Sequence, residues 1–127
     1  MPYQGYKSSI PATSTPRTLE YEAFAHVTYK LKTANSTPTT VEEEIRLQTA
    51  LHENLRLWDV LVLDVAASEN ALPDPLKAGL VYLARATHEH SRRIRNRSGD
   101  LQILLDINAS VMKGLRQHQE IKESEAA

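Results

Sequence analysis

The 127-residue chain contains no cysteine, which excludes disulfide bonds, cysteine-ligated zinc and cysteine nucleophiles. Its four glycines are too few for a sheet-rich fold that needs many tight turns. Neither sign of charge dominates, since 15 lysines and arginines face 16 acidic residues and the formal net charge is −1. No global electrostatic field would therefore draw the protein to nucleic acid or to an anionic membrane.

The sequence also lacks a long uninterrupted hydrophobic run. Its most apolar stretch, residues 55–67, contains Arg56, Asp59 and Asp64 and is too short to span a bilayer. Residues 1–7 include no apolar segment of the kind that a secretory signal peptide requires. We therefore expect a cytoplasmic protein with no membrane partner.

What is present is typical of one globular domain. Hydrophobic residues make up 41% of the chain and charged residues 24%, and the length suits one shared core rather than two. Residues 1–15 are rich in serine, threonine, proline and tyrosine, and we predict a flexible or loosely docked N-terminal tail. Residues 16–118 are expected to form the helical domain, and residues 119–127 a polar C-terminal tail.

Apolar residues that recur every three or four positions predict amphipathic helices. The first begins at Thr15-Pro16, a capping residue followed by a proline that fits a first turn, and extends to about Lys32. The second begins after Thr40, which has capping-box spacing to Glu43. Because the second half of this helix is apolar almost all round, we expect it to be the central helix.

Two further helices follow. The third begins near Pro73 and Pro75, which both fit within a first turn, and it ends before Gly99. Either Ser98 or Asp100 can cap the fourth helix. Four helices joined by connections of about 3–8 residues predict an all-α antiparallel bundle. The first helix has the weakest apolar stripe, so we expect it to be the most mobile.

No arrangement of side chains indicates catalysis. His88 and His90 lie two positions apart, so on a helix they point in nearly opposite directions and cannot share a metal ion. Asp59 and Asp64 diverge by about 140° on the second helix, a poor geometry for acid–base catalysis. Asp59 is expected to pair instead with Arg56. We predict a protein that is not an enzyme, with no catalytic, cofactor-binding or metal-binding residue.

Two polar features stand out against the apolar stripes. Asn108 falls in the middle of the stripe of the fourth helix, where a buried asparagine destabilises the fold unless it is hydrogen-bonded, but can fix helix register. Trp58 lies at the centre of the second helix and is predicted to be a core residue rather than an interface anchor.

A basic patch is expected near the end of the third helix. It consists of Arg85, Arg92, Arg93, Arg95 and Arg97. An RNA-binding surface usually adds stacking aromatic residues, and positive charge at a helix C-terminus is favoured by the helix dipole alone. We therefore prefer a solvated helix end, with a protein-binding or RNA-binding patch as the alternatives.

Short motifs occur in a specific order between about residue 45 and residue 116. A Leu-Trp helix ends in Leu-Asp-Val-Ala, an Asn-Ala-Leu-Pro turn leads into the next helix, an Ile-Arg pair follows, and Ile-Asn precedes a closing Gly-Leu. In this order and spacing the segment resembles the FlaF family of flagellar proteins. The signature positions, most of them expected to be architectural, are Trp58, Asp64, Asn70, Leu72, Pro73, Ile107, Asn108 and Leu115.

The resemblance implies a flagellar-biosynthesis regulator that supports flagellin synthesis or export and works alongside FlbT, a translational regulator. One hypothesis is that the protein binds flagellin as a secretion chaperone or adaptor. A second is that it regulates flagellin expression after transcription by binding FlbT or RNA through the basic patch. A third is a structural bundle that self-associates. A monomer or a weak homodimer is expected.

For the first hypothesis we place the partner surface on the first helix. Its apolar residues Leu19, Phe24, Val27 and Leu31 are the candidate contacts. The reason is that a helix with a poor stripe of its own can move or dock when an amphipathic partner arrives.

Overall fold

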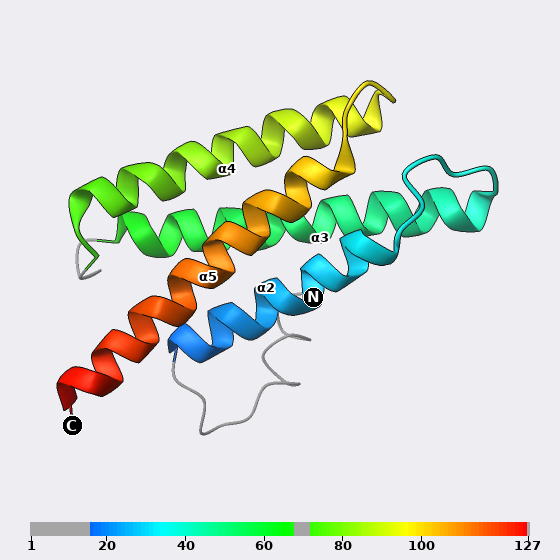
Figure 1. Ribbon diagram of the computed structural model, residues 1–127. Helices are drawn as coiled ribbons and strands as arrows, with labels where there is room; N and C mark the ends of the chain where they lie inside the picture. The colour runs from blue at the N-terminus through cyan, green and yellow to red at the C-terminus, as the bar shows by residue number, and fades with distance from the viewer. Residues whose placement is uncertain (1–15, 68–71, 127) are drawn as a thin grey trace.

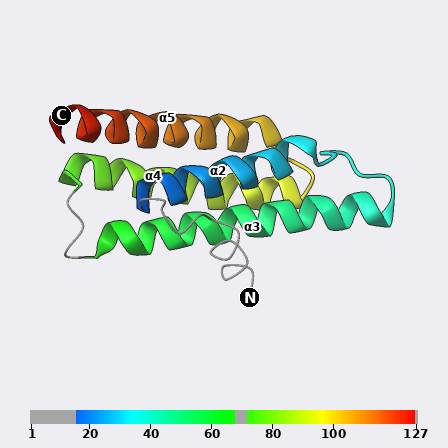
Figure 2. The same cartoon turned by 90° about the horizontal axis from the view of Figure 1, so that it is seen from below.

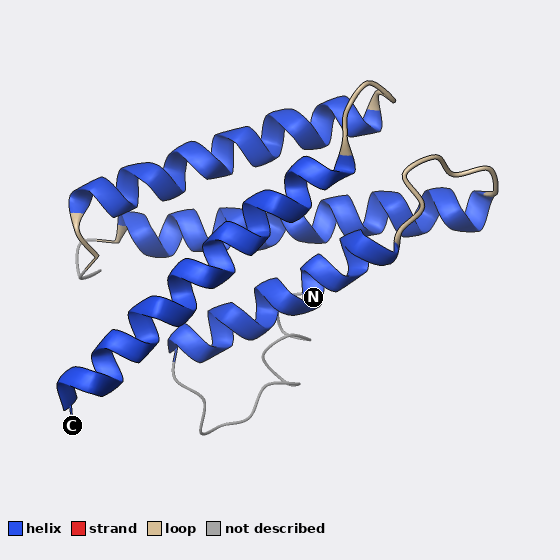
Figure 3. Cartoon of the chain, in the orientation of Figure 1, coloured by secondary structure: helices blue, strands red, loops and turns tan. Residues whose placement is uncertain are grey.

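The computed structural model describes residues 16–67 and 72–126, with side chains described for residues 21–67 and 72–117. These residues form four helices and no strand (Figures 1 and 3). The helices are α2 (Pro16–Thr33), α3 (Val41–Ala66), α4 (Asp74–Arg95) and α5 (Leu101–Ala126). The predicted all-α bundle is therefore confirmed. Residues 1–15, the predicted N-terminal tail, lie outside the described residues.

The helices form a four-membered ring in which successive helices run in opposite directions. α2 packs against α3 and α5, and α4 packs against the same two helices. α3 and α5 lie on one diagonal of the bundle, with α2 and α4 between them (Figure 2). α5 continues to Ala126, so the polar segment after residue 118 is helical as far as that residue.

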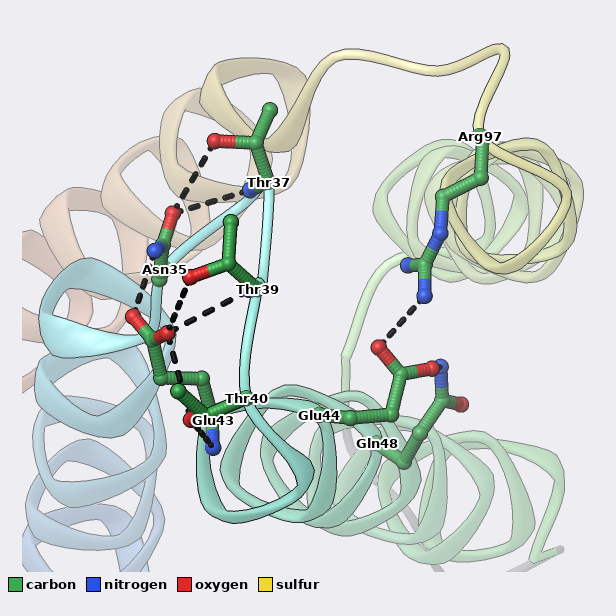
Figure 4. Close-up of polar contacts among 8 residues, drawn as sticks. All are labelled: Asn35, Thr37, Thr39, Thr40, Glu43, Glu44, Gln48 and Arg97. Carbon is green, nitrogen blue, oxygen red and sulfur yellow. Dashed lines mark hydrogen bonds and ion pairs between the residues drawn. The ribbon is translucent and has the colours of Figure 1, made fainter.

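α3 begins where its capping signal predicts. Thr40 has extended backbone angles, and its hydroxyl accepts a hydrogen bond of 3.1 Å from the Glu43 backbone N–H. The Glu43 carboxylate in turn accepts from the side chain of Asn35 at 2.6 Å and from the backbone N–H and hydroxyl of Thr39 (Figure 4). One glutamate therefore holds the whole α2–α3 loop against the start of α3.

These contacts predict a dependence of stability on pH. The hydrogen bond from Asn35, followed by those from Thr39, lowers the pKa of Glu43 from its usual 4.5 to about 2. A lowered pKa in the folded state means that the carboxylate stabilises the fold above pH 4.5, and that this contribution is lost as the pH falls toward 2. In urea unfolding at about pH 7 and about pH 3, we expect Glu43→Gln to lose less stability on acidification than the wild type.

The matched control for this prediction is Glu42→Gln, which removes an exposed carboxylate from the same helical turn. The control should keep the wild-type pH dependence. Equal acid sensitivity of Glu43→Gln and the wild type would contradict the prediction.

The α4–α5 connection is fixed by local backbone contacts. The Ser98 N–H donates to the Arg93 carbonyl at 2.9 Å and the Arg97 N–H donates to the Ile94 carbonyl at 3.0 Å, with Arg97 at a positive φ of 62°. This pair of hydrogen bonds is the Schellman motif, which ends a helix. Asp100, rather than Ser98, caps α5, because its carboxylate accepts from the Gln102 N–H at 2.9 Å.

The apolar core has two parts. One is formed around Trp58, which packs edge-on against Phe24 with ring centroids 5.4 Å apart, and the other is formed around Leu31, Leu51 and Leu104. Each of these side chains is at most 1% exposed, so the core position predicted for Trp58 is confirmed.

A buried polar layer lies between the two parts of the core. Asn108 accepts a hydrogen bond of 2.9 Å from the Trp58 indole N–H and donates to Asn54 at 2.8 Å and to Thr28 at 3.0 Å. Its side chain therefore joins α5 to both α2 and α3. Asn54 and Asn108 are completely buried, and burial strengthens such bonds and fixes the relative register of the helices.

Candidate functional site

An apolar groove of about 390 Å³ lies between α4 and α5. From α5 it is lined by Ser110, Val111, Gly114 and Leu115. From α4 and the residue before Pro73 it is lined by Leu72, Leu76, Gly79, Leu80, Tyr82 and Leu83. Apart from the hydroxyl groups of Ser110 and Tyr82, these side chains offer no polar group, so the groove suits an apolar ligand surface.

The course of the two helices explains where the groove lies. α4 and α5 meet at their short connection and diverge away from it (Figure 1). The first half of α4 therefore lies opposite the second half of α5 at a greater separation. Leu72, Val111 and Leu115 are each less than 9% exposed and also belong to the core, so the floor of the groove is part of the packed interior.

Two glycines keep the groove open. A Cβ atom added at Gly79 or at Gly114 would have no other atom within 4 Å. Neither glycine is therefore required by close helix packing, although a glycine inside a helix is less stable than alanine by about 0.5–1 kcal/mol. The packing of the described residues therefore does not explain why these two positions carry glycine.

The rim of the groove exposes large apolar side chains. Tyr82 is 72% exposed and Leu76 is 45% exposed, and both lie on α4 next to the opening. Isolated exposed apolar residues are normal on protein surfaces, whereas contiguous apolar surface marks an interaction site. The two residues extend the apolar surface of the groove outward and so make it a candidate partner-binding site.

The predicted basic patch is neutralised in part by two neighbouring carboxylates. Arg92 and Arg93 both pair with Glu89, at 2.7 Å and 3.2 Å, and Arg97 pairs with Glu44 of α3 (Figure 4). The hydrogen bond from Arg92 is the main reason that the pKa of Glu89 is lowered. The patch is therefore not one continuous positive surface, which weakens the case for RNA.

Two of the predicted arginines differ from the others. Arg85 and Arg95 form no ion pair with the described part of the chain, and both are exposed.

The expected pairing of Asp59 with Arg56 is wrong, because Asp59 lies 2.8 Å from the Nε2 atom of His88 on α4. α3 and α4 pack directly against each other, which brings His88 over the Asp59 side of α3.

No group of three or more histidine or acidic side chains within the described ranges could hold a metal ion. None of the helices in these ranges combines the length and apolar character needed to cross a membrane.

The family model for flagellar protein FlaF matches residues 2–115. The chain belongs to the FlaF family. The match includes the N-terminal third, so the similarity extends well beyond the segment of about residues 45–116 in which the sequence motifs stand out. No curated protein and no solved structure matches the chain.

Most FlaF signature positions are structural in this chain. Trp58 and Asn108 form the buried polar layer, and Ile107 is half-buried against the core. Pro73 occupies the N-cap position of α4 without a side-chain capping bond, and Asp64 is exposed on α3. Two signature positions, Leu72 and Leu115, also line the groove. Asn70 lies outside the described residues.

The partner surface predicted on the first helix is covered in this structure, so partner binding by these residues stays a prediction that requires α2 to move. Phe24, Val27 and Leu31 are each 0% exposed, because α2 packs its apolar face against both α3 and α5. In this conformation they offer no surface to a partner. The side chain of Leu19 lies outside the described side chains.

Sequence reasoning did not find the groove of this FlaF-family chain. Its apolar residues lie on helical stripes that also predict core positions, so periodicity alone cannot separate the two. The available signal was the pair of glycines within helices, Gly79 and Gly114, since glycine stabilises a helix less than alanine does.

Proposed function

We propose that this FlaF-family protein supports flagellin synthesis or export by binding flagellin as a secretion chaperone or adaptor. The proposed role is non-catalytic and cytoplasmic. The observation that carries it is the open apolar groove between α4 and α5, which two glycines widen without serving the fold. Membership of a flagellar family supports the choice of partner.

The dimensions of the groove fit a helix. The helical part of the wall from Leu76 to Leu83 is eight residues long, which corresponds to about 10 Å or two helical turns. An amphipathic partner helix places apolar side chains at positions i, i+3 or i+4, and i+7 along such a length. Flagellin helices that later pack inside the filament would have such apolar faces, and the groove would cover one of them before assembly.

The experiment is calorimetric titration of the full chain with its cognate monomeric flagellin, at about 50 and about 300 mM salt. An apolar groove should give saturable binding at both salt concentrations, because screening weakens charge contacts and not apolar burial. RNA or another strongly charge-driven partner should instead bind much more weakly at the higher concentration.

Filling the groove should weaken this binding without harming the fold. Gly79→Leu and Gly114→Leu place a side chain in open space, and leucine favours helix more than glycine does. We expect each variant to keep or raise the melting temperature and to weaken flagellin binding at least about tenfold. Gly114→Ala fills less of the groove and should weaken binding less.

The matched controls are Ala78→Leu on α4 and Ala109→Leu on α5, both at exposed positions outside the groove lining. Ala78 directly precedes Gly79 and Ala109 lies five residues before Gly114 on the same helix, and both controls should bind flagellin normally. Absence of binding at both salt concentrations would refute the flagellin proposal. Binding that survives both glycine substitutions would place flagellin elsewhere on the protein.

A further inference from the structure

A second groove, of about 680 Å³, lies between α3 and α4. On α4 it is lined by residues such as Val81, Ala84 and His88. The α4–α5 groove proposed to bind flagellin is lined instead by Leu76, Gly79 and Leu83. At 100° of rotation per residue these two sets lie on roughly opposite sides of the helix. α4 therefore separates two distinct grooves.

The floor of this second groove is apolar. Val62 of α3 and Val81 and Ala84 of α4 form it, and Leu63 of α3 stands at its edge. Leu63 is 73% exposed, although α3 has nine buried residues. The groove thus combines an apolar floor with an apolar side chain that nothing in the described structure covers.

The rim of the same groove is positively charged. Arg85, Arg92 and Arg95 line it together with two acidic residues, Asp59 and Glu89. Both acidic residues already have partners, since Asp59 contacts His88 and Glu89 contacts Arg92. Arg85 and Arg95 are left without an ion pair in the described structure, and ten residues of helix separate them by about 15 Å.

We infer that the α3–α4 groove is a docking surface for an acidic amphipathic helix of a partner protein. The apolar side of that helix lies on the floor, and its carboxylates reach Arg85 and Arg95, whose planar guanidinium groups bind carboxylates in a bidentate manner. Charge complementarity and the apolar floor together select this occupant. The inference does not depend on flagellin binding in the other groove.

A nucleic acid fits this groove less well. None of the described residues that line it is phenylalanine, tyrosine or tryptophan, so stacking platforms for bases are missing from it. Asp59 and Glu89 would also repel a phosphate backbone that follows the floor. An apolar floor adds nothing to phosphate binding but stabilises the apolar face of a helix.

The test uses a synthetic amphipathic peptide with leucines on one face and glutamates on the other, added to isotope-labelled full-length protein and followed by NMR. The expected result is saturable shifts of amide signals in residues 59–63 and 81–95. A peptide with every glutamate replaced by glutamine should bind at least about tenfold more weakly. The double variant Arg85→Glu/Arg95→Glu should show the same loss.

The control double variant is Lys32→Glu/Arg46→Glu, which makes the same change in net charge at exposed positions outside this groove. It should bind the acidic peptide like the wild type. Equal binding of the glutamine peptide, equal loss in the control variant, or no shifts in these residues would overturn the inference. Tighter binding of a single-stranded uridine oligomer at the same residues would replace it with a nucleic-acid surface.

The two grooves can be tested separately. Arg85→Glu/Arg95→Glu should leave the titration with flagellin unchanged, and Gly79→Leu should leave binding of the acidic peptide unchanged. Failure of one proposal therefore does not imply failure of the other.

Discussion

Replacing Asn108 by leucine is expected to lower the free energy of unfolding by about 2–4 kcal/mol, although leucine is similar in size and more apolar. Asn108 is fully buried and makes three hydrogen bonds, to Trp58, Asn54 and Thr28. Leucine would leave the indole N–H and the Asn54 carbonyl oxygen buried without these partners. Leaving one such group unsatisfied destabilises a protein by about 1–3 kcal/mol.

The measurement is urea unfolding followed by far-ultraviolet circular dichroism. The matched control is Ala109→Leu, which introduces the same side chain one position away on the exposed face of α5 and should change stability by less than about 0.5 kcal/mol. An Asn108→Leu protein as stable as the wild type would mean that the polar layer contributes nothing to stability.

The same variant can show that the polar layer acts as a unit. Trp58→Phe removes the indole N–H that Asn108 accepts, so its effect and that of Asn108→Leu should not add. We expect a coupling energy of about 0.5–3 kcal/mol in a double-mutant cycle of the two substitutions. Simple additivity would indicate that the bond of 2.9 Å between the two residues is energetically neutral.

Replacing Trp58 by alanine is expected to destabilise the protein by about 3–5 kcal/mol. Trp58 is 0% exposed, packs edge-on against Phe24 at an interplanar angle of 84°, and supplies the N–H for the polar layer. Alanine would remove this contact and leave a cavity among α2, α3 and α5. Since domains of this size are stable by only about 5–15 kcal/mol, the loss is a large part of the total.

Thermal and urea unfolding by circular dichroism would measure this loss. Trp58→Phe, which keeps an aromatic ring in the site, should be less destabilising than Trp58→Ala. Tyr82→Ala truncates an exposed aromatic ring and should cost at most about 0.5 kcal/mol. A loss below about 1 kcal/mol for Trp58→Ala would show that the surrounding helices close the cavity.

The packing bears on which helix can move to admit a partner. The weak apolar stripe of residues 16–33 predicted that this helix is the most mobile, and that expectation stays a prediction. In the structure α2 buries Phe24, Val27 and Leu31 and joins the polar layer through Thr28. The buried apolar residues within α4 are Ala84 and Ile94. Hydrogen exchange of α2 and α4 amides, with and without flagellin, would decide between them.

The pattern of residues along the chain was enough to predict the four helices, several of their ends and the family. Thr40 and Glu43 at the start of α3, and Pro73 and Pro75 at the start of α4, act within one or two turns, so their spacing in the chain is enough to locate these helix ends. The choice between Ser98 and Asp100 as the cap of α5 needed the structure. The apolar stripe placed Trp58 in the core. The ordered motifs identified the FlaF resemblance that the family match establishes.

Which surfaces are available depends on how the helices pack against one another. The partners of Asn108 lie 50 to 80 positions away in the chain, and Asp59 contacts His88 rather than its neighbour Arg56. Periodicity shows that a residue faces other elements, but not which helix covers it. The close packing of α2 buried the expected contact residues, whereas the divergence of α4 and α5 left apolar residues of similar spacing open as a groove.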